Sequence, residues 1–157
     1  MRVGFGYDVH PFAEGRALWL GGIQIPHARG LKGHSDADVL IHALCDALLG
    51  AANLRDIGYH FPDTDDAYKN IDSKILLART MDLLRTKNYQ TGNADITICA
   101  EAPKLNPHIP QMQTCLAAIM QIPPDDISIK ATTSEKMGFI GREEGIAVFA
   151  TVLIERI

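Results

Sequence analysis

Three polar residues in the first third of the chain have the side chains of a catalytic zinc site. Asp8 and His10 are two apart in a run, Arg2–His10, that reads as an extended strand, so both side chains leave the same face. His42, in a later helical segment, would supply a third ligand. One oxygen and two imidazole nitrogens are typical of catalytic zinc, which keeps a fourth position open. The alternative is that Asp8 is a turn residue, His10 a surface residue and His42 a packed core histidine.

The elements that must position these residues are predicted from apolar spacing and turn residues. Short apolar runs on either side of Gly21-Gly22 predict a hairpin, and Asp36 predicts the N-cap of a helix that ends near residue 51. Further helices are expected over 72–87 and after Pro107, and strands over 89–100, 127–133 and 146–154. This order predicts an α/β (α+β) chain, residues 1–157, forming a single domain with a mixed β-sheet covered by helices on one face, plus a small hairpin.

Further carboxylates surround the histidine of the helix. Asp38, His42 and Asp46 are spaced by four and share one stripe of the helix. Either aspartate could orient the imidazole as a hydrogen-bond acceptor, but a solvated helix face explains both equally well. The acidic segment 55–66 is likewise explained by a solvated loop with capping aspartates.

Bulk composition excludes several classes of protein. A net charge of −4 argues against a general nucleic-acid or acidic-membrane surface, and no apolar run approaches the roughly 20 residues that span a bilayer. Three widely spaced cysteines, Cys45, Cys99 and Cys115, predict buried free thiols in a reducing compartment. We expect a cytoplasmic protein, with a plastid protein after removal of its transit segment as the alternative.

Four stretches occur together in a specific order: Gly6-Tyr7-Asp8-Val9-His10, Gly33–Val39 with His42, Asp56-Ile57-Gly58 with Phe61–Asp65, and Ala131–Phe139. In combination they closely resemble the 2-C-methyl-D-erythritol 2,4-cyclodiphosphate synthase family of the non-mevalonate isoprenoid pathway. The resemblance continues through Gly141–Ala147 and covers essentially the whole chain.

The resemblance implies a homotrimer of subunits related to the ferredoxin-like arrangement, with active sites at subunit interfaces. It implies zinc at Asp8, His10 and His42, and a second divalent ion, Mg²⁺ or Mn²⁺, at Glu135. A single protein ligand suits magnesium, which commonly keeps waters and phosphate oxygens.

The resemblance also implies a cyclising phosphorus-oxygen lyase. It would convert 4-diphosphocytidyl-2-C-methyl-D-erythritol 2-phosphate to the 2,4-cyclodiphosphate and CMP. The neighbouring subunit's nucleotide and diphosphate pocket would comprise Ala100, Lys104, Leu105, Asn106, Ala131, Thr132, Thr133 and Ser134. The methylerythritol moiety would contact Asp56, Ile57 and Gly58, with Phe61, Pro62, Asp63, Thr64 and Asp65 as the flanking loop. His34, Ser35 and Thr133 would surround the phosphates, with His34 and Thr133 as catalytic hydrogen-bond donors.

This chemistry needs no strong general base. The attacking 2-phosphate is already ionised near neutral pH, which is consistent with the absence of an obvious Ser-His-Asp or Cys-His arrangement. The enzyme must instead align attacker and leaving group and neutralise the negative charge that spreads over the phosphates. In the family, zinc and the second ion would supply that neutralisation.

Several positions leave alternatives open. Ser134, Ile140 and Asn106 depart from the residues common in the family. Phe139 and Arg142 fit either trimer packing or binding of an isoprenoid diphosphate on the three-fold axis, with packing favoured. His27, His60 and His108 are expected at the surface. Rival functions are a zinc phosphohydrolase, in which water attacks the diphosphate, and a trimeric ferredoxin-like regulator that binds a nucleotide.

Overall fold

A mixed five-stranded sheet forms the centre of the molecule. The computed structural model describes all residues, 1–157. The strand order is β4-β1-β7-β5-β6, and a separate hairpin pairs β2 with β3. β5 and β6 are parallel, while the other neighbours are antiparallel. The mixed sheet with a small hairpin confirms the predicted fold class. The strands are β1 (Arg2–Ala13), β2 (Leu18–Leu20), β3 (Ile23–Ile25), β4 (Gly30–Leu31), β5 (Tyr89–Cys99), β6 (Ile127–Thr132) and β7 (Gly145–Arg156).

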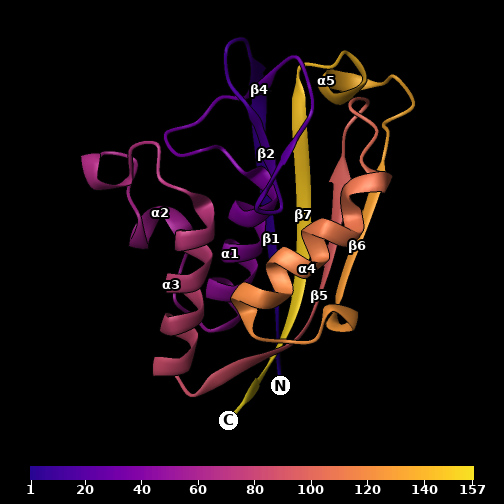
Figure 1. Ribbon diagram of the computed structural model, residues 1–157. Helices are drawn as coiled ribbons and strands as arrows, with labels where there is room; N and C mark the ends of the chain where they lie inside the picture. The colour runs from indigo at the N-terminus through magenta and orange to yellow at the C-terminus, as the bar shows by residue number, and fades with distance from the viewer.

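Three helices cover one face of the sheet (Figure 1): α1 (Val39–Ala51), α3 (Ser73–Thr86) and α4 (Ile109–Met120). Shorter turns connect them: α2 (Ile57–His60), α5 (Gly138–Gly141) and the 3-10 turns η1 (Asp66–Tyr68), η2 (Asn106–His108) and η3 (Pro124–Asp126). None of the helices combines the length and apolar character needed to span a membrane. The two chain ends lie near each other (Figure 1).

The N-cap of α1 is Asp38, so the prediction of Asp36 for this position is wrong. The buried Asp38 carboxylate accepts hydrogen bonds from the backbone N–H of Ile41 in α1 and of Gly21 and Gly22 in the hairpin turn. These three N–H donors offset the free-energy cost of burying the carboxylate of Asp38. Asp38 therefore joins the hairpin to the start of α1.

Two glycines bring β1 against α1. A Cβ added at Gly6 would lie 2.0 Å from the carbonyl oxygen of Ala43, and one at Gly4 would lie 1.9 Å from that of Ala47. Only a residue without a side chain allows this approach of two backbones. As a result, His42 of α1 lies next to the strand that carries Asp8 and His10.

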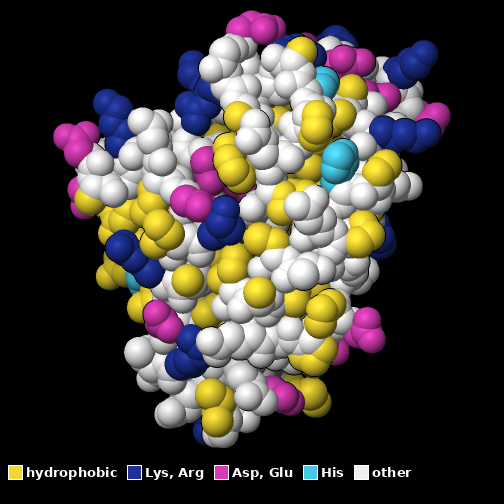
Figure 2. Space-filling model, in the orientation of Figure 1, with side chains coloured by type: hydrophobic (Ala, Val, Ile, Leu, Met, Phe, Trp, Pro, Cys, Tyr) yellow, Lys and Arg dark blue, Asp and Glu magenta, His cyan; other side chains and the backbone are white.

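The opposite face of β1 is uncovered and apolar. Its side chains, together with Phe149 of β7, are 39–68% exposed, and Phe149 lies with its ring centroid 5.0 Å from that of Tyr7. We call this set the aromatic sheet face: Val3, Phe5, Tyr7, Val9 and Phe149. A contiguous exposed apolar patch of this kind marks an interaction surface. The helix side differs, because Figure 2 shows acidic and basic side chains interspersed over it.

Other predictions need correction. All three cysteines are free, but only Cys45 is buried, while Cys99 and Cys115 are partly exposed. His27, His60 and His108 are half-buried rather than simply at the surface. The His60 ring donates a hydrogen bond to the carbonyl of Leu54 over 2.7 Å, which explains its inward position.

Candidate metal centre and active site

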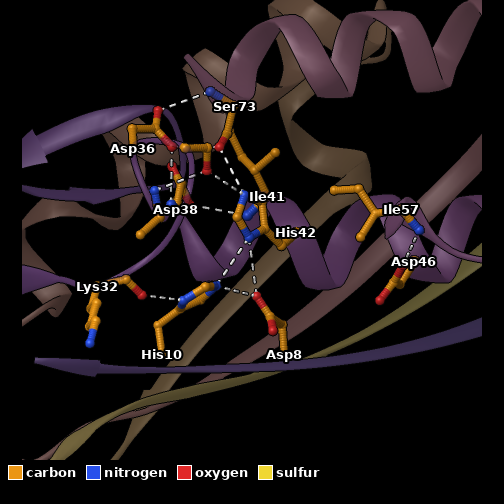
Figure 3. Close-up of polar contacts among 12 residues, drawn as sticks. Asp8, His10, Lys32, Asp36, Asp38, Ile41, His42, Asp46, Ile57 and Ser73 are labelled. Carbon is orange, nitrogen blue, oxygen red and sulfur yellow. Dashed lines mark hydrogen bonds and ion pairs between the residues drawn. The ribbon is translucent and has the colours of Figure 1, made fainter. Parts of the chain in front are cut away.

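Asp8, His10 and His42 meet in a compact cluster (Figure 3). Oδ2 of Asp8 lies 2.9 Å from Nε2 of His10 and 3.2 Å from Nδ1 of His42, and these two nitrogens are 3.2 Å apart. The three ligand atoms lie within 4.8 Å of one another, and each residue is half-buried. The alternative of three unrelated structural roles is wrong. One carboxylate oxygen and two ring nitrogens that face one point could hold a divalent metal ion, and they are donors of the kind that catalytic zinc sites use.

The cluster is electrostatically coupled. Burial raises the pKa of the Asp8 carboxyl, but hydrogen bonds and charge from His10 and His42 outweigh it and hold that pKa well below its usual range. Burial lowers the pKa of His10, but its hydrogen bond to Asp8 and the charge of that carboxylate raise it above the ordinary value. The geometry therefore brings together an ionised carboxylate and two imidazoles. A bound cation would neutralise the charge of the carboxylate and take the place of protons on the imidazole nitrogens.

Neither aspartate of the α1 stripe orients His42. Asp38 binds three backbone N–H groups, as described above, and Asp46 accepts a hydrogen bond from the N–H of Ile57 over 2.7 Å. Instead, Nε2 of His42 lies 3.0 Å from the hydroxyl of Ser73 and 3.2 Å from that of Ser35. Ser73 was not predicted as a functional residue, because a serine after the helix cap Asp72 has no distinctive local signal.

A cavity of about 390 Å³ opens beside the cluster. It is lined by the predicted zinc ligands His10 and His42 and by six residues predicted to bind the phosphates and the methylerythritol moiety: His34, Ser35, Ile57, Gly58, Phe61 and Asp63. Gly33, Tyr68, Ile71 and Leu76 also line it and were missed. Asp56, which caps α2, and Pro62, Thr64 and Asp65 do not line the cavity, and their contacts with the substrate stay predictions. The combined polar and apolar walls suit a small ligand with both polar and apolar parts.

A second cavity, of about 150 Å³, lies where the parallel strands β5 and β6 end. Seven of the eight residues predicted for the nucleotide and diphosphate pocket line it, together with Glu101 and Pro103, whereas Ser134 does not: the seven are Ala100, Lys104, Leu105, Asn106, Ala131, Thr132 and Thr133. The two cavities share no lining residue. The structure therefore brings each predicted group together, but it keeps the nucleotide-type group apart from the metal cluster.

The turn after β6 is held by Glu101, which sequence analysis did not single out. One oxygen, Oε1, accepts hydrogen bonds from the N–H of Ser134 over 3.1 Å, the hydroxyl of Ser134 over 3.3 Å and the N–H of Lys136 over 3.0 Å. Glu135 has a φ of 53° and Lys136 one of 61°, a left-handed conformation that such anchoring stabilises. The turn presents the exposed carboxylate of Glu135 next to Thr133, whose hydroxyl lies 3.3 Å from it.

Phe139 and Arg142 lie in and directly after α5, and neither lines either cavity. Both are exposed, and Arg142 forms an ion pair with Glu144 over 2.7 Å. Trimer packing and isoprenoid diphosphate binding both stay predictions for these residues. The consequences of the departures from the common family residues at Asn106, Ser134 and Ile140 also stay predictions.

Comparison with known proteins gives one consistent result. The sequence model of the YgbB family matches residues 1–155. The chain is 69% identical to the 2-C-methyl-D-erythritol 2,4-cyclodiphosphate synthase of Bacteroides thetaiotaomicron, over 99% of this chain and 98% of the relative. It is also similar to a solved CDP-bound form of a 2C-methyl-D-erythritol-2,4-cyclodiphosphate synthase, with a TM-score of 0.90, 36% identity, and coverage of 98% of this chain and 100% of that one.

A longer structure shows the same fold within a larger protein. The bifunctional IspDF of Campylobacter jejuni matches with a TM-score of 0.96 and 46% identity, over 99% of this chain but 42% of that one. This chain thus corresponds to less than half of the bifunctional protein and to nearly all of the single-activity relatives. The chain belongs to the YgbB family, whose relatives named above are 2-C-methyl-D-erythritol 2,4-cyclodiphosphate synthases.

Proposed function

We propose that this chain converts 4-diphosphocytidyl-2-C-methyl-D-erythritol 2-phosphate to 2-C-methyl-D-erythritol 2,4-cyclodiphosphate and CMP. The observation that carries the proposal is the Asp8, His10 and His42 cluster at the wall of a cavity that also contains His34 and Ser35. Full-length similarity to synthases of this name supports the choice of substrate. In the reaction, an oxygen of the 2-phosphate bonds to the β-phosphorus, and the bond from that phosphorus to the oxygen shared with the α-phosphate breaks, so that CMP leaves with this oxygen.

The residues of the cavity would hold the substrate in a bent conformation. His34 and Ser35 donate hydrogen bonds to phosphate oxygens, while Ile57, Phe61 and Leu76 form the apolar wall against the methylerythritol carbons. Zinc bound by Asp8, His10 and His42, and a Mg²⁺ or Mn²⁺ ion bound by Glu135, would supply Lewis acidity and charge neutralisation. Thr133 adds a hydroxyl donor on the nucleotide side. Alignment and charge stabilisation are the main requirements of phosphoryl transfer.

The rival phosphohydrolase differs in the product. With the cytidyl substrate, Mg²⁺ and Zn²⁺, phosphorus NMR should show two coupled signals of a cyclic diphosphate together with CMP. Linear methylerythritol phosphates would favour hydrolysis and contradict the proposal.

We also propose a homotrimer in which two subunits complete each active site. Within one chain, β7 and β5 lie between β1, which carries Asp8 and His10, and β6, at the nucleotide-type cavity. Three strand spacings separate β1 and β6 by about 14 Å. The aromatic sheet face offers the apolar surface on which copies of the chain would pack. Cyclic packing would place the metal cluster of one subunit opposite the nucleotide-type cavity of the next.

Subunit complementation tests the shared site. His42→Ala and Lys104→Glu subunits, each inactive alone, are co-expressed with different tags and purified as mixed assemblies. A head-to-tail trimer with both types has one interface at which both halves are intact. The purified mixed trimers should therefore have about a third of wild-type activity. Activity no higher than that of the separate variants would show that each site lies within one subunit.

Replacing Glu101 should affect the reaction through the turn that carries Glu135. Because a single oxygen accepts all three hydrogen bonds, Glu101→Gln keeps the acceptor and should stay within about threefold of wild-type turnover. Glu101→Leu removes the acceptor and should lower turnover roughly 10- to 100-fold, because the carboxylate of Glu135 is displaced. Steady-state kinetics at several Mg²⁺ concentrations measure the effect. Equal losses in both variants would point to the charge of Glu101 instead.

A further inference from the structure

A half-buried chain of hydrogen bonds extends behind His42, on the side away from Asp8 and His10 (Figure 3). Nε2 of His42 lies 3.0 Å from Oγ of Ser73, and that Oγ lies 2.5 Å from Oδ1 of Asp36. The side chain of Ser73 is fully buried. Asp36 also accepts hydrogen bonds from the N–H of Ser73 over 2.9 Å and from that of Asp38 over 3.1 Å. The carboxylate is therefore fixed by both α3 and the loop before α1.

The partners determine the direction of each hydrogen bond. An ionised carboxylate only accepts, so the single hydroxyl hydrogen of Ser73 is donated to Asp36. The oxygen of Ser73 can then only accept from the imidazole, which places the ring hydrogen of His42 on Nε2. Ser35 lies on the same side but farther away, 3.2 Å from Nε2; its oxygen accepts the N–H of Ala37, and its own hydrogen serves the phosphate contact proposed above. With a ring hydrogen on Nε2, Nδ1 of His42 faces the cluster as the nitrogen that would bind a metal in place of a proton.

His10 is arranged in the same way by a different group. Its Nδ1 lies 2.7 Å from the backbone carbonyl of Lys32, which can only accept, so Nδ1 carries a hydrogen, and Nε2, which faces Asp8, is the nitrogen that would bind a metal in place of a proton. The two imidazoles thus direct different ring nitrogens at one point, Nε2 of His10 and Nδ1 of His42. A hydrogen-bond acceptor on the far side of each ring fixes its orientation. Such outer hydrogen bonds set both the tautomer and the ring orientation of a metal-binding histidine.

We propose that Ser73 and Asp36 are positioning residues that hold His42 with Nδ1 directed at the metal. The role of the metal rests on the proposed function, while the tautomer rests on the hydrogen bonds alone. Asp36 orders the hydroxyl of Ser73, and Ser73 orders the ring. Neither Ser73 nor Asp36 lines the cavity proposed to bind the substrate. Any effect of these two residues on turnover therefore acts through the position of His42.

Zinc affinity of the metal-free, full-length protein tests this role. Competition with a chromophoric chelator should give a dissociation constant for Ser73→Ala that is roughly 10- to 100-fold weaker than that of wild type. Thr80→Ala is the matched control. Thr80 is another fully buried hydroxyl residue of α3, and its oxygen has no hydrogen-bond partner. The control should bind zinc within about twofold of wild type. Unchanged affinity in Ser73→Ala would overturn the proposal.

A double-mutant cycle separates positioning from simple loss of structure. If Asp36 acts through Ser73, Asp36→Asn should weaken zinc binding, and the double variant should lose little more than the stronger single variant. Fully additive losses would contradict the chain of hydrogen bonds. Melting temperatures show whether a variant has lost zinc affinity only because it is unfolded. If Ser73→Ala is unfolded, Ser73→Thr, which keeps the hydroxyl, should have the zinc affinity of wild type. Failure of this rescue would also count against the proposal.

Nitrogen NMR distinguishes failure of this proposal from failure of the proposed function. In metal-free wild type, at a pH at which the imidazoles are neutral, His42 should show a hydrogen on Nε2 and His10 one on Nδ1. In Ser73→Ala, His42 should become a mixture of tautomers. A hydrogen on Nδ1 of His42 in wild type would refute the inference even if zinc binds. Wild type that binds no zinc but shows the expected tautomers would refute the metal centre alone.

Discussion

His42→Ala should lose its bound zinc and at least about 10³-fold in turnover, while the fold and assembly survive. His42 supplies one of only three protein ligands, and its ring projects from α1 toward Asp8 instead of contributing to the apolar core. Removing it leaves Asp8 and His10, which are too few to hold zinc tightly. Asp8→Asn should act in the same direction, because the neutral amide is a much weaker ligand than the carboxylate.

Metal analysis, steady-state kinetics and sedimentation measure the three parts of this prediction separately. His27→Ala is the matched control, because His27 is a half-buried histidine that lines neither cavity described above. It should keep its zinc and its turnover. Near wild-type turnover in a His42→Ala protein shown to contain no zinc would contradict the role assigned to the cluster.

Gly6→Ala should destabilise the protein by about 3 kcal/mol or more, because the new Cβ would lie 2.0 Å from the carbonyl oxygen of Ala43. Backbone cannot move aside as a flexible side chain can, so α1 must shift away from β1. That shift separates His42 from Asp8 and His10, and we expect zinc affinity to fall together with stability.

Gly50→Ala, in α1, is the control. A Cβ at Gly50 meets nothing within 4 Å, and alanine is the better helix former. This variant should gain roughly 0.5–1 kcal/mol in stability and keep its zinc affinity. Chemical denaturation of both variants, followed by zinc titration, provides the comparison. A Gly6→Ala protein as stable as wild type would show that the α1 to β1 contact is looser than described.

The amino-acid sequence predicts most of the fold because its periodic patterns are strong. Alternation in β1 and helical spacing in α1 and α3 correctly predict these elements, and the carboxylate and imidazoles of the cluster are recognisable by type. The predicted N-cap residue of α1 was wrong, because Asp36 and Asp38 are equally good capping residues when only the sequence is considered. Only the fold shows that Asp38 meets the hairpin turn, whereas Asp36 meets Ser73.

Residues that act across long sequence separations were not predictable in the same way. Ser73 contacts His42 from 31 positions away, and Glu101 anchors Ser134 from 33 positions away. Serine and glutamate are common surface residues, so their types alone indicate no role. The outer hydrogen bonds of a site depend on how helices and loops pack, and local patterns do not encode that packing.

The most direct test of the proposed cyclisation is the origin of the oxygen atoms in the products. The purified enzyme is incubated with the cytidyl substrate, Mg²⁺ and Zn²⁺ in water enriched in ¹⁸O, and both products are analysed by mass spectrometry. Attack by the 2-phosphate of the substrate brings no solvent oxygen into either product, so the cyclic diphosphate and CMP should both be unlabelled. An ¹⁸O atom in CMP or in a linear methylerythritol phosphate would show that water is the nucleophile and would contradict the cyclisation.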